Sequence, residues 1–251
     1  MKIIDTHAHI GTSKNTGVTI TEEDLLGAMR QNSVSAALVM PQPVSYEESC
    51  GVHKRIYELS RKFPAMIYGI SCVDPWIPED VFMQETIRCI EEYGFKALKI
   101  NCHGHNVSPL SHLCGKIYKT AARYNLPVVV HTGLGTPVSL PSLVMKPATD
   151  YPEVSFVLAH AGFALYCDEA IVAASLCKNI ILEPSWCQTY MTRRMIDTIG
   201  IHRIIMGSDH LTNLPIEILK YHCIGLAEAD REAVFYANPK RVFHLADQAR
   251  D

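Results

Sequence analysis

Two histidines, His7 and His9, stand two positions apart at the end of the first apolar run of the chain. Residues i and i+2 of a β-strand share one face, so both imidazoles point the same way if this run is a strand. Imidazole is the commonest protein ligand for zinc and related divalent cations. The pair alone is a weak signal, but His131, His160 and Asp209 follow later apolar runs in the same way. Together these residues predict a metal site.

Short β-rich runs alternate with longer amphipathic stretches along the whole chain. The predicted strands cover residues 2–7, 36–40, 67–73, 97–101, 128–131, 155–160, 179–183 and 203–208. The predicted helices cover residues 22–31, 46–63, 78–93, 110–124, 165–177 and 190–199, with a weaker helical pattern over 139–151. Runs that are apolar throughout, such as 127–130 and 203–206, are typical of parallel strands covered on both faces.

This alternation predicts an α/β fold, a (β/α)8 TIM barrel formed as a single domain by residues 1–251. A doubly wound open sheet is the alternative, but the Gly-rich phosphate turn expected after its first strand is absent. In a TIM barrel the active site lies at the carboxyl ends of the strands. We therefore expect His7, His9, His131, His160 and Asp209 to converge at one mouth. Unpaired imidazoles and a carboxylate are costly to bury, so convergence favours a ligand role.

With these residues in place, the chain resembles the amidohydrolase superfamily of metal-dependent TIM-barrel enzymes, most closely its amidohydrolase-related (amidohydrolase 2) branch. The motifs that carry the resemblance are IDTHAH (4–9), GFKALKI (94–100), PVVVHTG (127–133), LAHAG (158–162), MGSD (206–209) and the tail 238–245, expected to pack on the outside or bottom of the barrel. The resemblance implies that His7, His9, His131 and Asp209 coordinate a divalent metal, commonly Zn²⁺. It places His160 beside that metal, as a second-metal ligand or a catalytic group.

The function implied is a metal-dependent hydrolase that cleaves an amide, ester or lactone bond of a small molecule through a metal-activated water. Such a site leaves one metal position open for water and lowers the pKa of that water to about 7. Asp209 would take the proton and pass it to the leaving group. The same branch includes enzymes of a second type, so a non-oxidative decarboxylase or hydratase of an unsaturated or aromatic carboxylic acid is the alternative. A metal-free lactonase and a non-enzymatic binding barrel are the remaining hypotheses.

Lys99 ends the fourth predicted strand, where binuclear members of the superfamily carry a carboxylated lysine that bridges two metals. Lys99 and His160 are therefore the candidate second-metal ligands. The alternative is a free ammonium that neutralises Asp5, Glu183 or a substrate carboxylate, and this role needs no modification. We expect one metal per chain rather than two.

Four residues beyond the strand ends are candidate substrate contacts. His103 and His105 lie in the loop after the fourth predicted strand, and the two tryptophans, Trp76 and Trp186, follow the third and seventh. Aromatic side chains at this position stack on ring substrates, but packing of loop side chains explains them equally well. His210, which follows Asp209, is a minor candidate.

Composition limits the partners. The chain of 251 residues has a net charge of −3, and its sequence shows no Lys/Arg-rich run, which argues against nucleic acid or an anionic membrane. No apolar stretch approaches the ~20 residues of a membrane span, and the start of the chain does not resemble a secretory signal. We therefore expect a cytoplasmic protein with a small-molecule substrate, its oligomeric state open. The nine cysteines form no CxxC pair and are expected to be reduced thiols.

Overall fold

The computed structural model describes residues 1–134 and 136–246, so residue 135 and residues 247–251 of the predicted domain lie outside it. The fold is an α/β TIM barrel, as the sequence predicts. Its sheet has the strand order β2-β1-β3-β4-β5-β6-β7-β8, in which β2 pairs antiparallel with the end of β1 and every other pair is parallel. The strands are β1 (Ile4–Thr12), β2 (Thr19–Ile20), β3 (Ala36–Pro41), β4 (Ile67–Ser71), β5 (Ala97–Ile100), β6 (Val128–His131), β7 (Phe156–Ala159) and β8 (Ile180–Glu183).

The strands are apolar on both faces because each face meets a different part of the core. In β3, for example, Leu38 and Met40 belong to a cluster inside the barrel. Their neighbours Ala37 and Val39 belong to a second cluster, between the sheet and the surrounding helices. This explains why these runs do not alternate between apolar and polar residues. Polar residues appear where the strands end, and that edge of the sheet carries the site.

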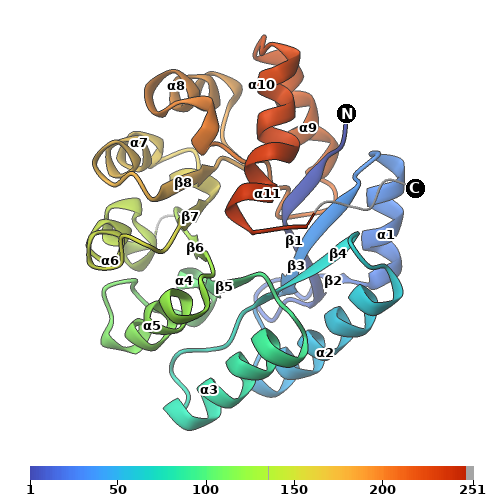
Figure 1. Ribbon diagram of the computed structural model, residues 1–251, viewed down its shortest axis with the longest axis vertical. Coiled ribbons are helices and arrows are strands. Elements are labelled where there is room, and N and C mark those ends of the chain that lie inside the picture. The colour runs from blue at the N-terminus through green and yellow to red at the C-terminus, as the bar shows by residue number, and fades with distance from the viewer. Residues whose placement is uncertain (135, 247–251) are drawn as a thin grey trace.

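The helices surround the strands (Figure 1). They are α1 (Glu22–Gln31), α2 (Tyr46–Lys62), α3 (Glu79–Ile87), α4 (Cys102–His105), α5 (Gly115–Tyr124), α6 (Met145–Asp150), α7 (Cys167–Leu176), α8 (Thr189–Ile199), α9 (Leu214–Cys223), α10 (Glu228–Glu232) and α11 (Asn238–Val242). Thr21 and Ser45 start α1 and α2 with capping boxes, in which each side chain accepts a backbone N–H from the first turn. The predicted helix 78–93 is α3 followed by a π-helical turn, Arg88–Glu92.

The eighth predicted strand, residues 203–208, is not a regular strand in the structure. A single parallel bridge joins Leu182 to Ile204, and the N–H of Ile205 donates to the carbonyl of Leu182 at 3.1 Å. A 3-10 turn, Ile201–Arg203, includes the first residue of the predicted strand. The segment nevertheless fills the eighth place of the barrel, since it lies between β8 and β1.

Backbone and side-chain hydrogen bonds close the remaining seam between β1 and this segment. The N–H of Thr6 donates to the carbonyl of Met206 at 3.1 Å. The two oxygens of Asp5 accept the N–H of Ser208 at 2.9 Å and its hydroxyl at 2.6 Å. Residues 200 or more positions apart are therefore tied together directly beneath the site.

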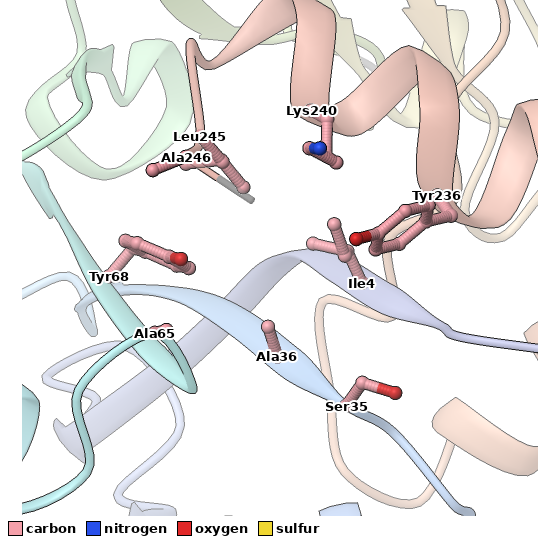
Figure 2. Close-up of a pocket in the computed structure, with 9 residues that line it drawn as sticks. All are labelled: Ile4, Ser35, Ala36, Ala65, Tyr68, Tyr236, Lys240, Leu245 and Ala246. Carbon is pink, nitrogen blue, oxygen red and sulfur yellow. The ribbon is translucent and has the colours of Figure 1, made fainter. Parts of the chain in front are cut away.

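The end of the chain covers the opposite face of the barrel. Phe243 and Leu245, just after α11, join the inner cluster next to Ile4 at the start of β1, so the tail packs at the bottom of the barrel. Figure 2 shows the cavity that remains there, between Tyr68, Lys240 and the tail. Its volume of about 10 Å³ is at the limit for one water molecule, so it is not a substrate site.

The nine cysteines are free thiols, as the sequence predicts. Among the residues that the structure describes, no helix combines the length and the apolar character needed to cross a bilayer.

Candidate metal centre at the strand ends

His7 and His9 point toward each other from β1, with their Nε2 atoms 3.1 Å apart. The other ring nitrogen of each has a fixed oxygen partner. Nδ1 of His9 lies 2.9 Å from the carbonyl oxygen of Pro41. Because a carbonyl only accepts hydrogen bonds, the His9 proton resides on Nδ1. The Nε2 atom of His9 is therefore a bare lone pair.

The same reasoning applies to His7. Its Nδ1 lies 2.9 Å from Oε2 of Glu183, which also accepts the hydroxyl of Ser185 at 3.1 Å, while Oε1 accepts the Ser185 N–H at 2.7 Å. Burial raises the pKa of Glu183 well above its usual value, whereas the two Ser185 donors act in the opposite sense. Burial, followed by the charge of Lys99, holds the pKa of His7 well below its usual value, so the ring is neutral. Nε2 of His7 faces the Lys99 ammonium, which can only donate, so the single proton of the neutral ring is on Nδ1, facing Glu183.

The two Nε2 atoms therefore lie within hydrogen-bond distance of each other, but neither carries a proton to donate. A carboxylate oxygen lies at the same point: Oδ1 of Asp209 is 3.3 Å from Nε2 of His9 and 3.5 Å from Nε2 of His7. Burial alone would raise the pKa of Asp209, but the surrounding imidazoles, His160 first and then His9 and His7, hold it well below its usual value. The Asp209 side chain is 28% exposed, so this point is open to the mouth.

His160 approaches from the end of β7 and stacks on His7, with ring centroids 5.0 Å apart. Its Nδ1 lies 2.8 Å from the hydroxyl of Ser185, which in turn donates to Glu183, so His160 donates from Nδ1 and keeps Nε2 bare. Burial lowers the pKa of His160 to about 4. Ligand atoms of His7, His160 and Asp209 all lie within 4.8 Å of one another.

His131, at the end of β6, lies beside His160 with ring centroids 4.8 Å apart. It is buried, and burial holds its pKa well below the usual value. Within the described part of the chain, its Nε2 has no hydrogen-bond partner. A buried nitrogen without a partner is costly unless a ligand or ion completes it.

The donor set thus fits a divalent cation. It offers bare imidazole nitrogens whose opposite ring nitrogens are held by a carboxylate, a carbonyl or a hydroxyl, and such outer partners orient ligating histidines in metal sites. Together with one carboxylate, these are ligands that zinc, manganese and iron accept.

Lys99 reaches the same centre from β5. Its Nζ lies 3.3 Å from Nε2 of His7, and the side chain is buried. Burial lowers the pKa of Lys99 below its usual value. The structure therefore places the Lys99 amine beside the imidazole of His7, at the same strand-end centre.

Three site residues have left-handed backbone conformations that are unfavourable for side chains other than glycine. The φ angles are 68° at His160, 65° at Trp186 and 62° at Asp209. Such strain persists where surrounding contacts impose it, and it is concentrated at functional sites. Here the sharp turns aim these three side chains into the mouth.

The outer candidates divide into two groups. His103 stacks on His131 at 5.9 Å between centroids, next to the centre. His105 is buried on the other side of α4, and its carbonyl accepts the indole N–H of Trp76 at 2.9 Å. Trp186 contacts the centre directly, because its indole N–H donates to Oδ2 of Asp209 at 2.8 Å. His210 bonds to Thr212 in its own loop and does not contact the imidazoles described above.

Two residues of the centre are not among the ligands and substrate contacts predicted from the sequence: Ser185, and Glu183, which is named there only as a possible partner of Lys99. Glu183 ends β8 just as His131 ends β6, so the rule that selects strand-end polar residues also selects Glu183. Ser185, which links His160 to Glu183, carries no comparable signal, since a serine two residues beyond a strand is common in loops.

A second cluster, His53, Glu85 and Cys89, also brings potential ligand atoms together. Nδ1 of His53 lies 2.9 Å from Glu85, and its Nε2 accepts the backbone N–H of Cys72 at 3.0 Å. Both ring nitrogens are therefore occupied, and no lone pair remains for a cation. This cluster ties α2 to α3 and to the end of β4.

Solved structures of known enzymes share the fold. One is 5-carboxyvanillate decarboxylase from Sphingomonas paucimobilis, with a TM-score of 0.74, 12% identity and coverage of 98% of this chain and 99% of that one. Another is 4-oxalomesaconate hydratase from Rhodopseudomonas palustris, with a TM-score of 0.69, 16% identity and coverage of 96% and 95%. A third is a dihydroxybenzoic acid decarboxylase from a Polaromonas species with bound manganese and the inhibitor 2-nitroresorcinol, with a TM-score of 0.74, 15% identity and coverage of 98% of both chains.

At these identities the likeness concerns the fold. A search of curated protein sequences finds no significant match. The sequence model of the amidohydrolase family, in contrast, matches residues 4–245, from the first residue of β1 to the tail beneath the barrel. With its strand-end histidines and Asp209 in place, this chain belongs to the amidohydrolase family.

Proposed function

We propose that this protein is a metal-dependent hydrolase that uses water to cleave an amide, ester or lactone bond of a small molecule. His7, His9, His131 and Asp209 would hold one divalent cation, with Zn²⁺ the first choice. One observation carries the proposal: His7, His9 and His160 donate from Nδ1 to neighbouring oxygens, which leaves bare Nε2 atoms at a centre shared with Asp209.

A cation bound there would polarise the substrate carbonyl and bring the pKa of a water molecule to about 7. The residues supply the proton transfers. Oδ1 of Asp209 lies at the centre and the side chain is partly exposed, so it can take a proton from water and release it to the leaving group. The bare Nε2 of His160 orients the attacking water or accepts a hydrogen bond from it, and Ser185 keeps that ring in place.

The distribution of protons favours adding water over protonating carbon. Asp209 and the Nε2 atoms of His7, His9 and His160 accept protons, and Lys99 is a donor 3.3 Å from Nε2 of His7. Hydrolysis needs a base to deprotonate water, whereas decarboxylation needs an acid to protonate the carbon that loses carbon dioxide.

A decarboxylase or hydratase of an unsaturated or aromatic carboxylic acid is the second candidate. Lys99 favours it, because an ammonium 3.3 Å from His7 would attract a substrate carboxylate. The decarboxylases and the hydratase that share this fold also favour it. In a decarboxylase, His160 or Asp209 would have to deliver the proton.

Substrate contacts are proposed for four side chains around the mouth. His103 adjoins His131 and Trp186 adjoins Asp209, so these two would touch the reacting end of the substrate. His105 and Trp76 lie farther along the β4 and β5 loops and would contact its remainder.

The test begins with elemental analysis of protein purified without chelator or added metal. About one zinc or manganese per chain, lost in a His7→Ala/His9→Ala variant, is the expected result. Metal-loaded protein is then screened with amides, lactones and aromatic acids in ¹⁸O-labelled water. Label in the product together with cleavage supports hydrolysis, and label without cleavage identifies a hydratase. Release of carbon dioxide with no label in the organic product would overturn the hydrolase proposal. Absence of metal binding would overturn both metal-dependent candidates.

A further inference from the structure

The two oxygens of Asp209 have different partners, because one of them accepts a hydrogen bond from the indole of Trp186. Its Nε1 donates to Oδ2 at 2.8 Å, while Oδ1 lies 3.3 Å from Nε2 of His9. An indole N–H can only donate, so this bond requires an acceptor oxygen at that position. The terminal torsion of an aspartate is otherwise broad. The bond to Trp186 therefore fixes the rotation of the Asp209 carboxylate, with one oxygen on the indole and the other facing the imidazoles.

The loop that carries Trp186 is held from α9. The backbone N–H of Trp186 donates to Oε1 of Glu217 at 2.9 Å, and Glu217 forms a buried ion pair with Lys220. Lys220 also donates to the carbonyl of Cys187 at 3.2 Å and to that of Pro184 at 2.6 Å. One buried ion pair thus holds the loop before, at and after Trp186.

The ring itself is fixed on one side and open on the other. Phe163 stacks against it, with centroids 6.1 Å apart and an interplanar angle of 23°. The left-handed φ of 65° at Trp186 turns the indole toward Asp209. Its side of the mouth is open to solvent, since Trp186 is 38% exposed.

We propose that Trp186 is a positioning residue: it keeps Oδ1 of Asp209 directed at His7 and His9, and the Glu217–Lys220 pair of α9 keeps Trp186 in place. Trp186 acts through Asp209. The inference rests on the proposed function for the identity of what Asp209 binds, whereas the hydrogen bond itself is independent of it.

The hydrogen bond is tested first, by NMR. The chain has two tryptophans, so a ¹H–¹⁵N spectrum contains two indole signals, and Trp76→Phe assigns them. Asp209→Ala should move the Trp186 signal and leave that of Trp76, whose indole donates to the backbone of His105. An unmoved Trp186 signal would overturn the proposal. This measurement needs neither a metal nor a Trp186 variant that folds.

The effect on Asp209 is tested by titrating metal-free protein with Mn²⁺ in a calorimeter. Trp186→Phe keeps a ring against Phe163 and removes the N–H, so we expect affinity to fall about tenfold, as for other outer partners of metal ligands. Trp76→Phe is the matched control: it removes the other indole N–H, which donates to the backbone of His105, and no substrate is present in the titration, so it should bind Mn²⁺ as the wild type does. In an Asp209→Ala background the Trp186→Phe change should cause no further loss, because the oxygen it orients is gone.

Unchanged affinity in Trp186→Phe, or an equal loss with and without Asp209, would overturn the positioning role. Circular dichroism and a thermal melt establish that each variant is folded before titration. If the wild type itself binds no Mn²⁺, the proposed function fails, while the indole signals still decide whether Trp186 holds Asp209.

Discussion

Replacing Glu183 by glutamine tests how the centre sets the protons of its histidines. Glu183 accepts hydrogen bonds from Nδ1 of His7 at 2.9 Å, from the N–H of Ser185 at 2.7 Å and from its hydroxyl at 3.1 Å. A carboxylate accepts on both oxygens, whereas an amide has one acceptor and one donor. Glu183→Gln therefore leaves one donor of the pocket without its acceptor.

Both orientations of the amide are unfavourable, for different reasons. If its oxygen stays with the Ser185 N–H, its NH₂ faces Nδ1 of His7, and His7 must move its proton to Nε2, where the proton blocks the cation position. If its oxygen stays with His7, its NH₂ faces the Ser185 N–H, and two buried donors meet. The first orientation weakens metal binding, and the second destabilises the fold.

The size of each effect follows from the contacts. Loss of an outer partner of a ligating histidine lowers metal affinity about 10- to 100-fold, which corresponds to about 1.4–2.7 kcal/mol. A buried donor without a partner costs about 1–3 kcal/mol of stability. At this chain length each kcal/mol lowers the melting temperature by roughly 2–4 °C.

The assay is calorimetric titration of metal-free protein with Zn²⁺ or Mn²⁺, combined with thermal melts. Glu85→Gln is the matched control, because Glu85 is equally buried and bonded to a histidine, His53, away from the centre. We expect Glu85→Gln to lower stability and to leave metal affinity unchanged. Wild-type metal affinity and wild-type stability together in Glu183→Gln would refute this reasoning.

Three further experiments have expected outcomes, two of them away from the centre and one at Lys99. Burial holds the pKa of His53 below its ordinary 6.5, so the folded state binds fewer protons than the unfolded state below that pH, and stability falls as pH falls; His53→Gln, whose amide can still donate to Glu85, should flatten the loss of melting temperature between pH 7 and 5. Gly69→Ala would place a Cβ 2.2 Å from the buried ring of Phe95 and should cost about 1–3 kcal/mol by urea unfolding, with partial recovery when Phe95→Leu is added; an unchanged unfolding midpoint would contradict the packing. If Lys99 is a free amine, the metal content of the purified protein should remain about one per chain after bicarbonate is added, and the intact mass should show no carboxyl adduct.

Much of this architecture can be predicted from local sequence patterns. The strands and the helices that start at Thr21 and Ser45 follow from apolar runs and capping residues. His7, His9 and Asp209 come together as expected because the parallel order of the strands brings their carboxyl ends to one edge. The ligand roles of these residues remain a prediction that metal analysis decides.

Other features depend on contacts that no local pattern reports. Residues 203–208 predict a strand because their centre, 204–206, is apolar. In the structure Ser208 is held by Asp5 rather than by a regular ladder, and Gly207 packs closely on His7 and Glu183. The hairpin strand β2 is too short to show a pattern. The sequence predicts a loop at residues 102–105, but they form the single helical turn α4, which points His103 and His105 in different directions.

The seam between β1 and residues 204–208 sets an order of events during biosynthesis. A growing chain exposes His7 and His9 first, whereas Asp209 and the serine that anchors Asp5 emerge after more than 200 residues have been made. An incomplete chain therefore has the imidazoles but not the carboxylate, and has no closed barrel to shield them from water. Contacts this distant in sequence form late in folding. Only the folded, complete barrel would therefore bind a cation tightly through the proposed ligands. A chain that ends before residue 204 would bind the cation weakly.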